Sequence, residues 1–201
     1  ERLVGSEMCI RDRNYVIGTH PHEDHIGGLD DVINSDLKIE NLWMPKIQTN
    51  TKTFEDVLDA VKNKGLKVTA PNKGDSFEIG KAKCEVMTDS ILNKDNLNLS
   101  SIVIRLEFEN NSFLFMGDAE TANEKTRTWM KTDVLKVGHH GSNTSSSEDF
   151  LKQINPTYAV IMAGKNNSYG LPKQKILDRL TKIGAKVYRT DEAVSYTHLT
   201  L

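Results

Sequence analysis

Residues 19–28, which read Thr-His-Pro-His-Glu-Asp-His-Ile-Gly-Gly, decide how this chain is interpreted. Four potential metal ligands fall within six residues: His20, His22, Asp24 and His25. On an extended loop His20 and His22 project to the same side, so they can bind one metal ion. Asp24 and His25 lie where the chain turns into a helix and can bind a second ion. Imidazole and carboxylate together suit zinc, manganese or iron, and a solvated turn is the plain alternative.

Two later segments place similar side chains at the ends of apolar strands. Asp118 follows an apolar run and a glycine, and a carboxylate in that position can bridge two metal ions. Residues 136–142 read Lys-Val-Gly-His-His-Gly-Ser, so another apolar strand ends in imidazoles. One histidine is expected to complete a metal shell, and the other to contact a phosphate or donate a proton. The residues do not say which is which; we take His140 as the ligand and His139 as the catalytic group.

Three polar residues are candidates for substrate binding, whereas Glu120 is not. Ser142 and Asn143 offer hydrogen-bond donors to an anion, although they can equally cap the helix that follows. Asn98 is a polar side chain between the first cluster and Asp118. Glu120 is interpreted as a solvated acid in the first turn of a helix, where it complements the helix dipole.

The hydrophobic pattern predicts a layered α/β fold with helices outside packed sheets. Antiparallel hairpins in the centre are followed by strand–helix alternation. Thr53 and Asp56 are expected to cap the second helix, and Asn110-Asn111 to form a hairpin turn. The expected strands are 14–19, 42–44, 66–70, 77–79, 82–87, 102–108, 112–116, 134–137, 158–163 and 185–189. The expected helices are 26–33, 53–64, 119–130, 146–154 and 172–183.

Length and charge exclude several classes of protein. The 201 residues suffice for one domain with a sizeable core. The 26 basic and 28 acidic residues leave a net charge of −2, which argues against a nucleic-acid binder driven by bulk positive charge. The sequence contains no run of about 18 apolar residues, so it predicts no membrane-spanning helix. The two cysteines, Cys9 and Cys84, cannot form a disulfide scaffold or a cysteine zinc site.

The two ends differ from the middle of the chain. Residues 5–13 and 194–201 resemble translated sequencing-adapter read-through, so we expect residues 1–13 to be a non-native leader and residues 194–201 a non-native tail. The domain itself is expected at residues 14–193. An ordinary amphipathic leader and a short terminal strand are the alternatives.

Taken in order, these motifs resemble the metallo-β-lactamase superfamily. The branch that they resemble is the C-terminal hydrolase domain of ComEC-type competence proteins, which take up DNA. The resemblance covers residues 14–193 and is carried by THPHEDHIGGL (19–29), SSIVIRLEFENNSFLFMGDAE (100–120), DVLKVGHHGSNTSSSEDFL (133–151) and AGKNNSYG (163–170).

The resemblance implies a four-layer αββα sandwich with a binuclear metal site at one edge. His20 and His22 would bind one ion, Asp24 and His25 the other, and Asp118 would bridge them. Relatives carry further strands ahead of the first cluster, so we expect an N-terminally truncated domain. They also have Gly-His-Pro at residues 170–172, where this chain has leucine.

The expected function is hydrolysis of DNA phosphodiesters with two divalent ions, zinc or manganese, with Asp24 and His139 as catalytic residues. Lys136, Lys165, Lys173 and Lys175 are candidate DNA contacts. The parent would be a bacterial membrane protein, and this chain its extracytoplasmic domain. One alternative is a stand-alone, cytoplasmic hydrolase of a small ester, lactone or phosphodiester. A second is a metal-binding relic that no longer catalyses.

Overall fold

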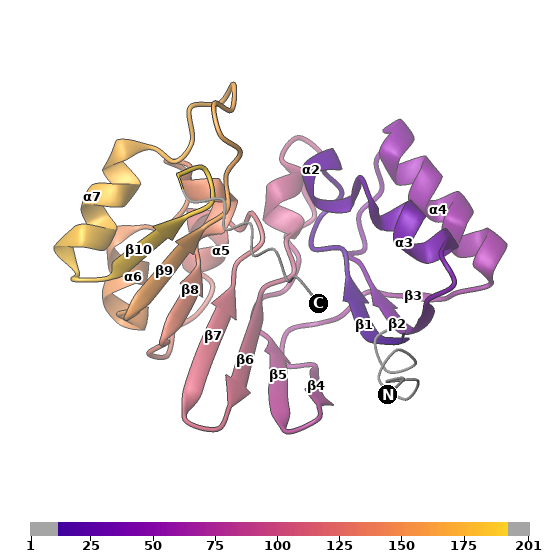
Figure 1. Cartoon of the computed structure of the whole chain (residues 1–201), viewed down its shortest axis with the longest axis horizontal. Coiled ribbons are helices and arrows are strands. Elements are labelled where there is room, and N and C mark those ends of the chain that lie inside the picture. Colours follow the sequence, from indigo (N-terminus) through magenta and orange to yellow (C-terminus); the bar gives the residue numbers. More distant parts are fainter. Residues whose placement is uncertain (1–11, 193–201) are drawn as a thin grey trace, which may run out of the picture.

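The computed structural model describes residues 12–192, which form two sheets and the helices that cover them (Figure 1). The expected tail and all but two residues of the expected leader lie outside the described residues. Those two, Asp12 and Arg13, belong to the first strand and pair with Lys38 and Ile39. Within the described residues, no helix is long and apolar enough to cross a bilayer.

The small sheet consists of three parallel strands in the order β1-β2-β3. Its helices α3 and α4 lie on the side away from the large sheet (Figure 1). Phe54, Val57 and Val61 of α4 pack with Ile33 of α3 and with Leu42 of the sheet. The elements are β1 (Asp12–Ile17), α2 (Glu23–Ile26), α3 (Leu29–Asn34), β2 (Lys38–Trp43), α4 (Lys52–Lys64) and β3 (Val68–Thr69).

The large sheet has seven strands in the order β10-β9-β8-β7-β6-β5-β4. Strands β4 to β7 are antiparallel neighbours, whereas β7 to β10 are parallel. The strands are β4 (Ser76–Ile79), β5 (Ala82–Val86), β6 (Ile104–Phe108), β7 (Asn111–Phe115), β8 (Val134–Lys136), β9 (Tyr158–Ile161) and β10 (Lys186–Arg189). The helices are η1 (Leu97–Ser100), α5 (Thr121–Glu124), η2 (Gly138–Gly141), α6 (Glu148–Ile154) and α7 (Gln174–Lys182).

Three apolar clusters define four layers. One joins α3 and α4 to the small sheet, and another joins α6 and α7 to the large sheet. The third lies between the sheets, where Tyr15 of β1 stacks on Phe77 of β4 at 4.0 Å and Trp43 of β2 meets the same ring edge-on. The expected αββα sandwich is therefore confirmed.

Two expected helices are wrong. The helix at 26–33 is divided into α2 and α3, because Gly27 caps the end of α2 and Gly28, with φ −110° and ψ 11°, lies outside helical geometry. The helix at 119–130 shrinks to α5. Beyond its end, the indole of Trp129 folds back and donates to Glu124 O, in the last residue of α5, at 2.6 Å.

Two turn assignments also change. The cap of α4 is Thr51, whose hydroxyl accepts from Phe54 N at 3.4 Å, and not Thr53. The hairpin between β6 and β7 turns at Glu109 and Asn110, with Phe108 paired to Asn111. Glu109 has a φ of 54°, which is left-handed and uncommon for glutamate.

Candidate metal centre

The first histidine cluster follows the end of β1 and is tied to both sheets. Gly18 N donates to Trp43 O of β2 at 2.9 Å, and Thr19 O accepts from Ile102 N at 2.9 Å on the segment leading into β6. His22 then precedes α2 in extended conformation, and Asp24 and His25 lie in that short helix. The loop is thereby held against the large sheet.

Asp118 approaches this loop from the large sheet, just after β7. Gly117 has a φ of 54°, and a Cβ there would lie 3.2 Å from Ser101 Oγ and from Thr19 Cβ. Glycine at this position therefore permits both the turn and the close approach of the neighbouring segments that carry Ser101 and Thr19. Ser101 Oγ accepts from Asp118 N at 3.1 Å, which fixes the backbone of the buried carboxylate.

His139 and His140 follow β8 and are both left-handed, with φ values of 47° and 52°. Such conformations are costly for residues other than glycine and cluster at functional sites. His140 Nδ1 is hydrogen-bonded to Met162 O, which makes Nδ1 the protonated nitrogen. Nε2 then keeps its lone pair, as a metal ligand requires.

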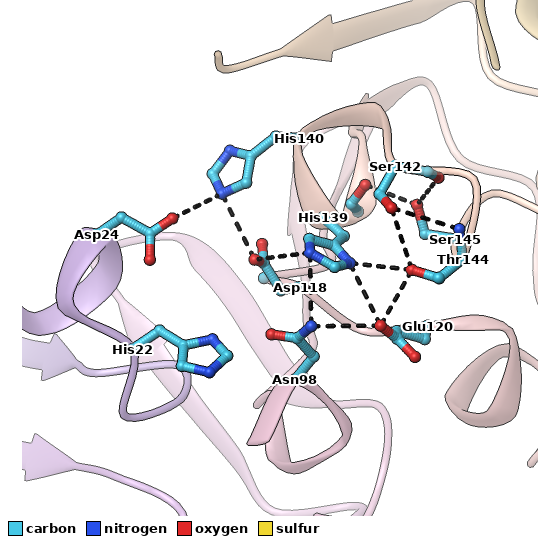
Figure 2. A network of polar contacts seen from close by, with 12 residues as sticks. His22, Asp24, Asn98, Asp118, Glu120, His139, His140, Ser142, Thr144 and Ser145 are labelled. Atoms are coloured by element: carbon cyan, nitrogen blue, oxygen red, sulfur yellow. Dashed lines mark hydrogen bonds and ion pairs between the residues drawn. The ribbon is translucent and has the colours of Figure 1, made fainter. Parts of the chain in front are cut away.

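Four donor atoms from the two sides lie within 4.8 Å of one another: those of Asp24, His25, Asp118 and His140. His25 Nε2 lies 3.1 Å from His140 Nε2 and 3.2 Å from Asp118 Oδ1. His140 Nε2 lies 3.2 Å from Asp24 Oδ2 and 3.4 Å from Asp118 Oδ2 (Figure 2). Ligands about 2.0–2.1 Å from a tetrahedral ion lie about 3.3 Å apart. The spacing therefore fits one divalent ion.

The carboxylate of Asp118 supports this interpretation independently. Its Oδ1 is buried and accepts no hydrogen bond of acceptable geometry, although His25 Nε2 lies 3.2 Å away. An unpaired buried carboxylate oxygen is costly, and a cation would satisfy it. The described residues thus fit a metal on the criteria of spacing and of an unsatisfied ligand atom.

His20 and His22 form a second group beside Asp118. His20 Nε2 lies 3.0 Å from His22 Nδ1 and 3.8 Å from Asp118 Oδ2. Burial and, after it, the neighbouring His25 lower the pKa of His20 to about 3. His20 is therefore neutral at physiological pH, which is the form that binds metal.

The histidines control the charge of Asp118. Burial by itself would raise the pKa of this carboxyl, but the close contacts with His140 and His25 outweigh burial and lower it. The same contact with Asp118 raises the pKa of His140 against the effect of burial. Asp118 is accordingly an anion in the folded protein, as a bridging ligand must be.

His139 is held in a separate network on the other side of Asp118 (Figure 2). Its Nδ1 lies 3.0 Å from Thr144 Oγ1 and 3.3 Å from Glu120 Oε1. Its Nε2 lies 3.4 Å from Asn98 Nδ2 and 4.0 Å from Asp118 Oδ2. The ring is therefore oriented from one nitrogen while the other is directed toward the metal centre.

Glu120 belongs to the network around His139, which the sequence interpretation did not anticipate. It is not a solvated acid: its side chain is largely buried and accepts from Asn96, Asn98 and Thr144 at 3.0–3.2 Å. The available clue is its spacing from Asp118. Both residues follow the end of β7, so a site built at that strand end can include both.

The structure does not bring every predicted residue to the cleft. A cleft of about 570 Å³ is lined by Pro21, His22, Glu23, Asp24, Thr51, Thr53, Asn98, Asp118, His139, His140, Tyr169 and Leu171. Ser142 and Asn143 are outside this lining, and Ser142 Oγ lies 3.3 Å from Thr144 Oγ1. Tyr169 was not anticipated.

Lys136, one of the four lysines expected to contact DNA, is not placed for that role. Lys136 is largely buried, and its ammonium donates to Gly117 O at 3.0 Å and lies 3.9 Å from Asp118 Oδ1. Burial lowers its pKa, partly offset by Asp118. Lys136 therefore supports the segment that carries Asp118. Lys165 and Lys175 are exposed.

Sequence comparisons agree with the geometry. The chain is 34% identical over 187 residues to "ComE operon protein 3" of Bacillus subtilis, covering 91% of this chain and 24% of that protein. It is 37% identical over 99 residues to "Competence protein ComA" of Neisseria gonorrhoeae, covering 47% and 14%. The chain thus spans a quarter or less of these relatives.

Structural comparison gives the same fold. The diiron β-hydroxylase CmlA of Streptomyces venezuelae superposes with a TM-score of 0.58 at 12% identity, covering 89% of this chain and 44% of that one. At that identity the likeness concerns the fold alone. The named competence relatives are consistent with a ComEC-type domain. Residues 10–165 match the metallo-β-lactamase superfamily, and this match shows that the chain belongs to that superfamily.

Proposed function

We propose that this domain is a metal-dependent phosphodiesterase that cleaves DNA. Asp24, His25, Asp118 and His140 would hold one divalent ion, zinc or manganese. His20 and His22, with Asp118 as the bridge, would hold a second. The spacing of donors around the unpaired Asp118 Oδ1 is the observation that carries the proposal.

Two divalent ions, when bound, lower the pKa of water and stabilise charge on the attacking and leaving oxygens of a phosphodiester. The rest of the chemistry falls to the chain. His139 is oriented at Nδ1 by Thr144 and Glu120, so its Nε2 can donate a proton to the leaving oxygen. The side chain of Asp24 is 63% exposed at the cleft, where it can accept a proton from water.

The biological setting follows from the relatives. Because named competence proteins match this chain over part of their length, we propose that the domain acts in DNA uptake by a bacterium. Its place would be outside the cytoplasm, as one part of a larger membrane protein.

The test is hydrolysis by the purified chain loaded with zinc or with manganese. Metal analysis should find close to two ions per chain. Bis-p-nitrophenyl phosphate and a DNA oligonucleotide should both be cleaved, and p-nitrophenyl acetate and a lactone more slowly. A matched control is Asp56→Ala, which removes an exposed acid on α4 that pairs with Lys52.

Two results would contradict the proposal in different ways. Faster cleavage of the ester or lactone would favour a small-molecule hydrolase. Less than one bound ion per chain, with no cleavage of any substrate in added metal, would indicate a domain that no longer catalyses.

A further inference from the structure

Tyr169 lies at the rim of the cleft with 77% of its surface exposed. It belongs to the segment of residues 162–173 that joins β9 to α7. The same residue lines the cleft and a second hollow of about 400 Å³ beside it. A large ring so exposed contributes little to the core, and next to a metal centre it is placed for contact with a ligand.

The second hollow continues the metal centre. It shares Asp24 and His140 with the cleft, and its other walls include Met162, Ala163 and Leu171. A ligand whose phosphate lies at the metal ligands can therefore extend a flat, apolar group into this hollow. Aromatic and apolar walls with a few polar groups at one end are typical of ligand sites.

The segment that carries Tyr169 is held by its own hydrogen bonds. The side chain of Asn167 donates to Gly164 O at 2.9 Å and to Leu171 O at 2.7 Å, and it accepts from Leu171 N at 3.0 Å. Lys173 N donates to Gly141 O at 3.0 Å, next to His140. The backbone that carries the ring is thus positioned before a ligand arrives, which lowers the entropic cost of ordering this segment on binding.

We propose that Tyr169 stacks on an unpaired nucleobase beside the scissile phosphate, so that the substrate is single-stranded DNA. This inference rests on the proposed phosphodiesterase function and names its substrate class. A base within a duplex has both faces covered by its neighbours, whereas an unpaired base offers a free face to an aromatic side chain. Every base has such a face, so the contact accepts any sequence. The exposed Lys165 on the same segment supplies positive charge for the backbone.

The experiment measures binding and not turnover. Fluorescence anisotropy of a labelled oligothymidylate with hydrolysis-resistant phosphorothioate linkages is recorded with the metal-loaded chain, and gel electrophoresis verifies that the probe stays intact. Removal of one stacking ring should weaken binding about 5- to 150-fold in Tyr169→Ala. Tyr169→Phe should retain the affinity. Tyr188→Ala is the matched control, because Tyr188 is 47% exposed on β10 and lies outside both hollows.

Two further probes make the result specific. A strand of the same length without bases should bind equally to the wild type and to Tyr169→Ala, and a duplex should bind more weakly than the single strand. Equal affinity of Tyr169→Ala and Tyr188→Ala for oligothymidylate would overturn the inference, as would a duplex that binds as tightly as the single strand.

Failure of the inference and failure of the proposed function are separable. Cleavage of bis-p-nitrophenyl phosphate together with binding that ignores Tyr169 would overturn only the stacking role. Binding that depends on Tyr169 without any cleavage would support the stacking role and contradict the phosphodiesterase.

Discussion

Asp118 is the residue at which the two sides of the metal centre meet. His25 approaches one of its oxygens from α2, and His140 approaches the other from the loop after β8. Its Oδ2 also lies 3.8 Å from Nε2 of His20, which belongs to the second group, so this one buried carboxylate contacts both groups of candidate ligands. Its removal should therefore affect more than one ion.

Asp118→Ala should reduce metal loading from two ions to one or fewer per chain. Phosphodiesterase activity should fall by more than about 100-fold, which exceeds the losses seen when only the support of a ligand is removed. Metal analysis after gel filtration measures the first effect and steady-state kinetics the second. Asp56→Ala, the exposed control, should retain both ions. Two tightly bound ions in Asp118→Ala would refute the bridging role.

At the scale of elements, the helix cap of α4 offers a comparison between two threonines. Thr51 accepts from Phe54 N, whereas Thr53 lies within the helix. Thr51→Ala should lower the free energy of unfolding by about 1 kcal/mol, as loss of a cap does. Thr53→Ala should leave it unchanged or slightly raised, because alanine is the better helix former. Urea denaturation of both variants measures the difference, and equal losses would contradict this assignment.

Glu124 links α5 to the start of α6. Its two carboxylate oxygens accept from Ser146 N and Ser147 N, the latter at 3.0 Å, and burial raises the pKa of the carboxyl against those hydrogen bonds. In Glu124→Gln an amide NH2 group replaces one carboxylate oxygen, so a donor faces the backbone N–H that this oxygen had accepted from. The free energy of unfolding should fall by about 1–3 kcal/mol. Glu78→Gln, at an exposed position on β4, should change it by less than about 0.5 kcal/mol. Equal effects would show that the link contributes nothing.

The sequence predicts elements best where local pattern and tertiary contacts agree. The expected hairpin of β4 and β5 is present. Asp118, the His20-His22 pair and the His139-His140 pair each follow the end of a strand, and they lie close together at one edge of the fold. The helix expected at 119–130 is wrong in length: α5 ends at Glu124, whose carbonyl accepts from the indole of Trp129, and the pattern of residues 119–130 does not reveal that tertiary contact. Glu120 was missed for a similar reason, since its partners Asn96 and Asn98 lie on another segment.

At the scale of the molecule, the metal centre joins elements that belong to different sheets. His20, His22, Asp24 and His25 follow a strand of the small sheet, whereas Asp118 and His140 follow strands of the large one. The loops meet beside α2 (Figure 1). Between the sheets, further contacts include the apolar cluster around Phe77 and the hydrogen bond from Ile102 N to Thr19 O at 2.9 Å. A bound ion therefore adds links between the two layers.

Chelation should consequently lower the stability of the whole fold and not only its activity. An ion present at about 100 times its dissociation constant stabilises the folded state by about 2.7 kcal/mol. For a domain of this size, each kcal/mol of unfolding free energy corresponds to about 2–4 °C in melting temperature. EDTA should therefore lower the midpoint of thermal unfolding by roughly 5–11 °C. Differential scanning calorimetry with and without zinc measures this shift. In Asp118→Ala the shift should be largely lost, because the shared ligand is gone. A zinc-dependent shift of full size in that variant would place the stabilising ion elsewhere in the molecule.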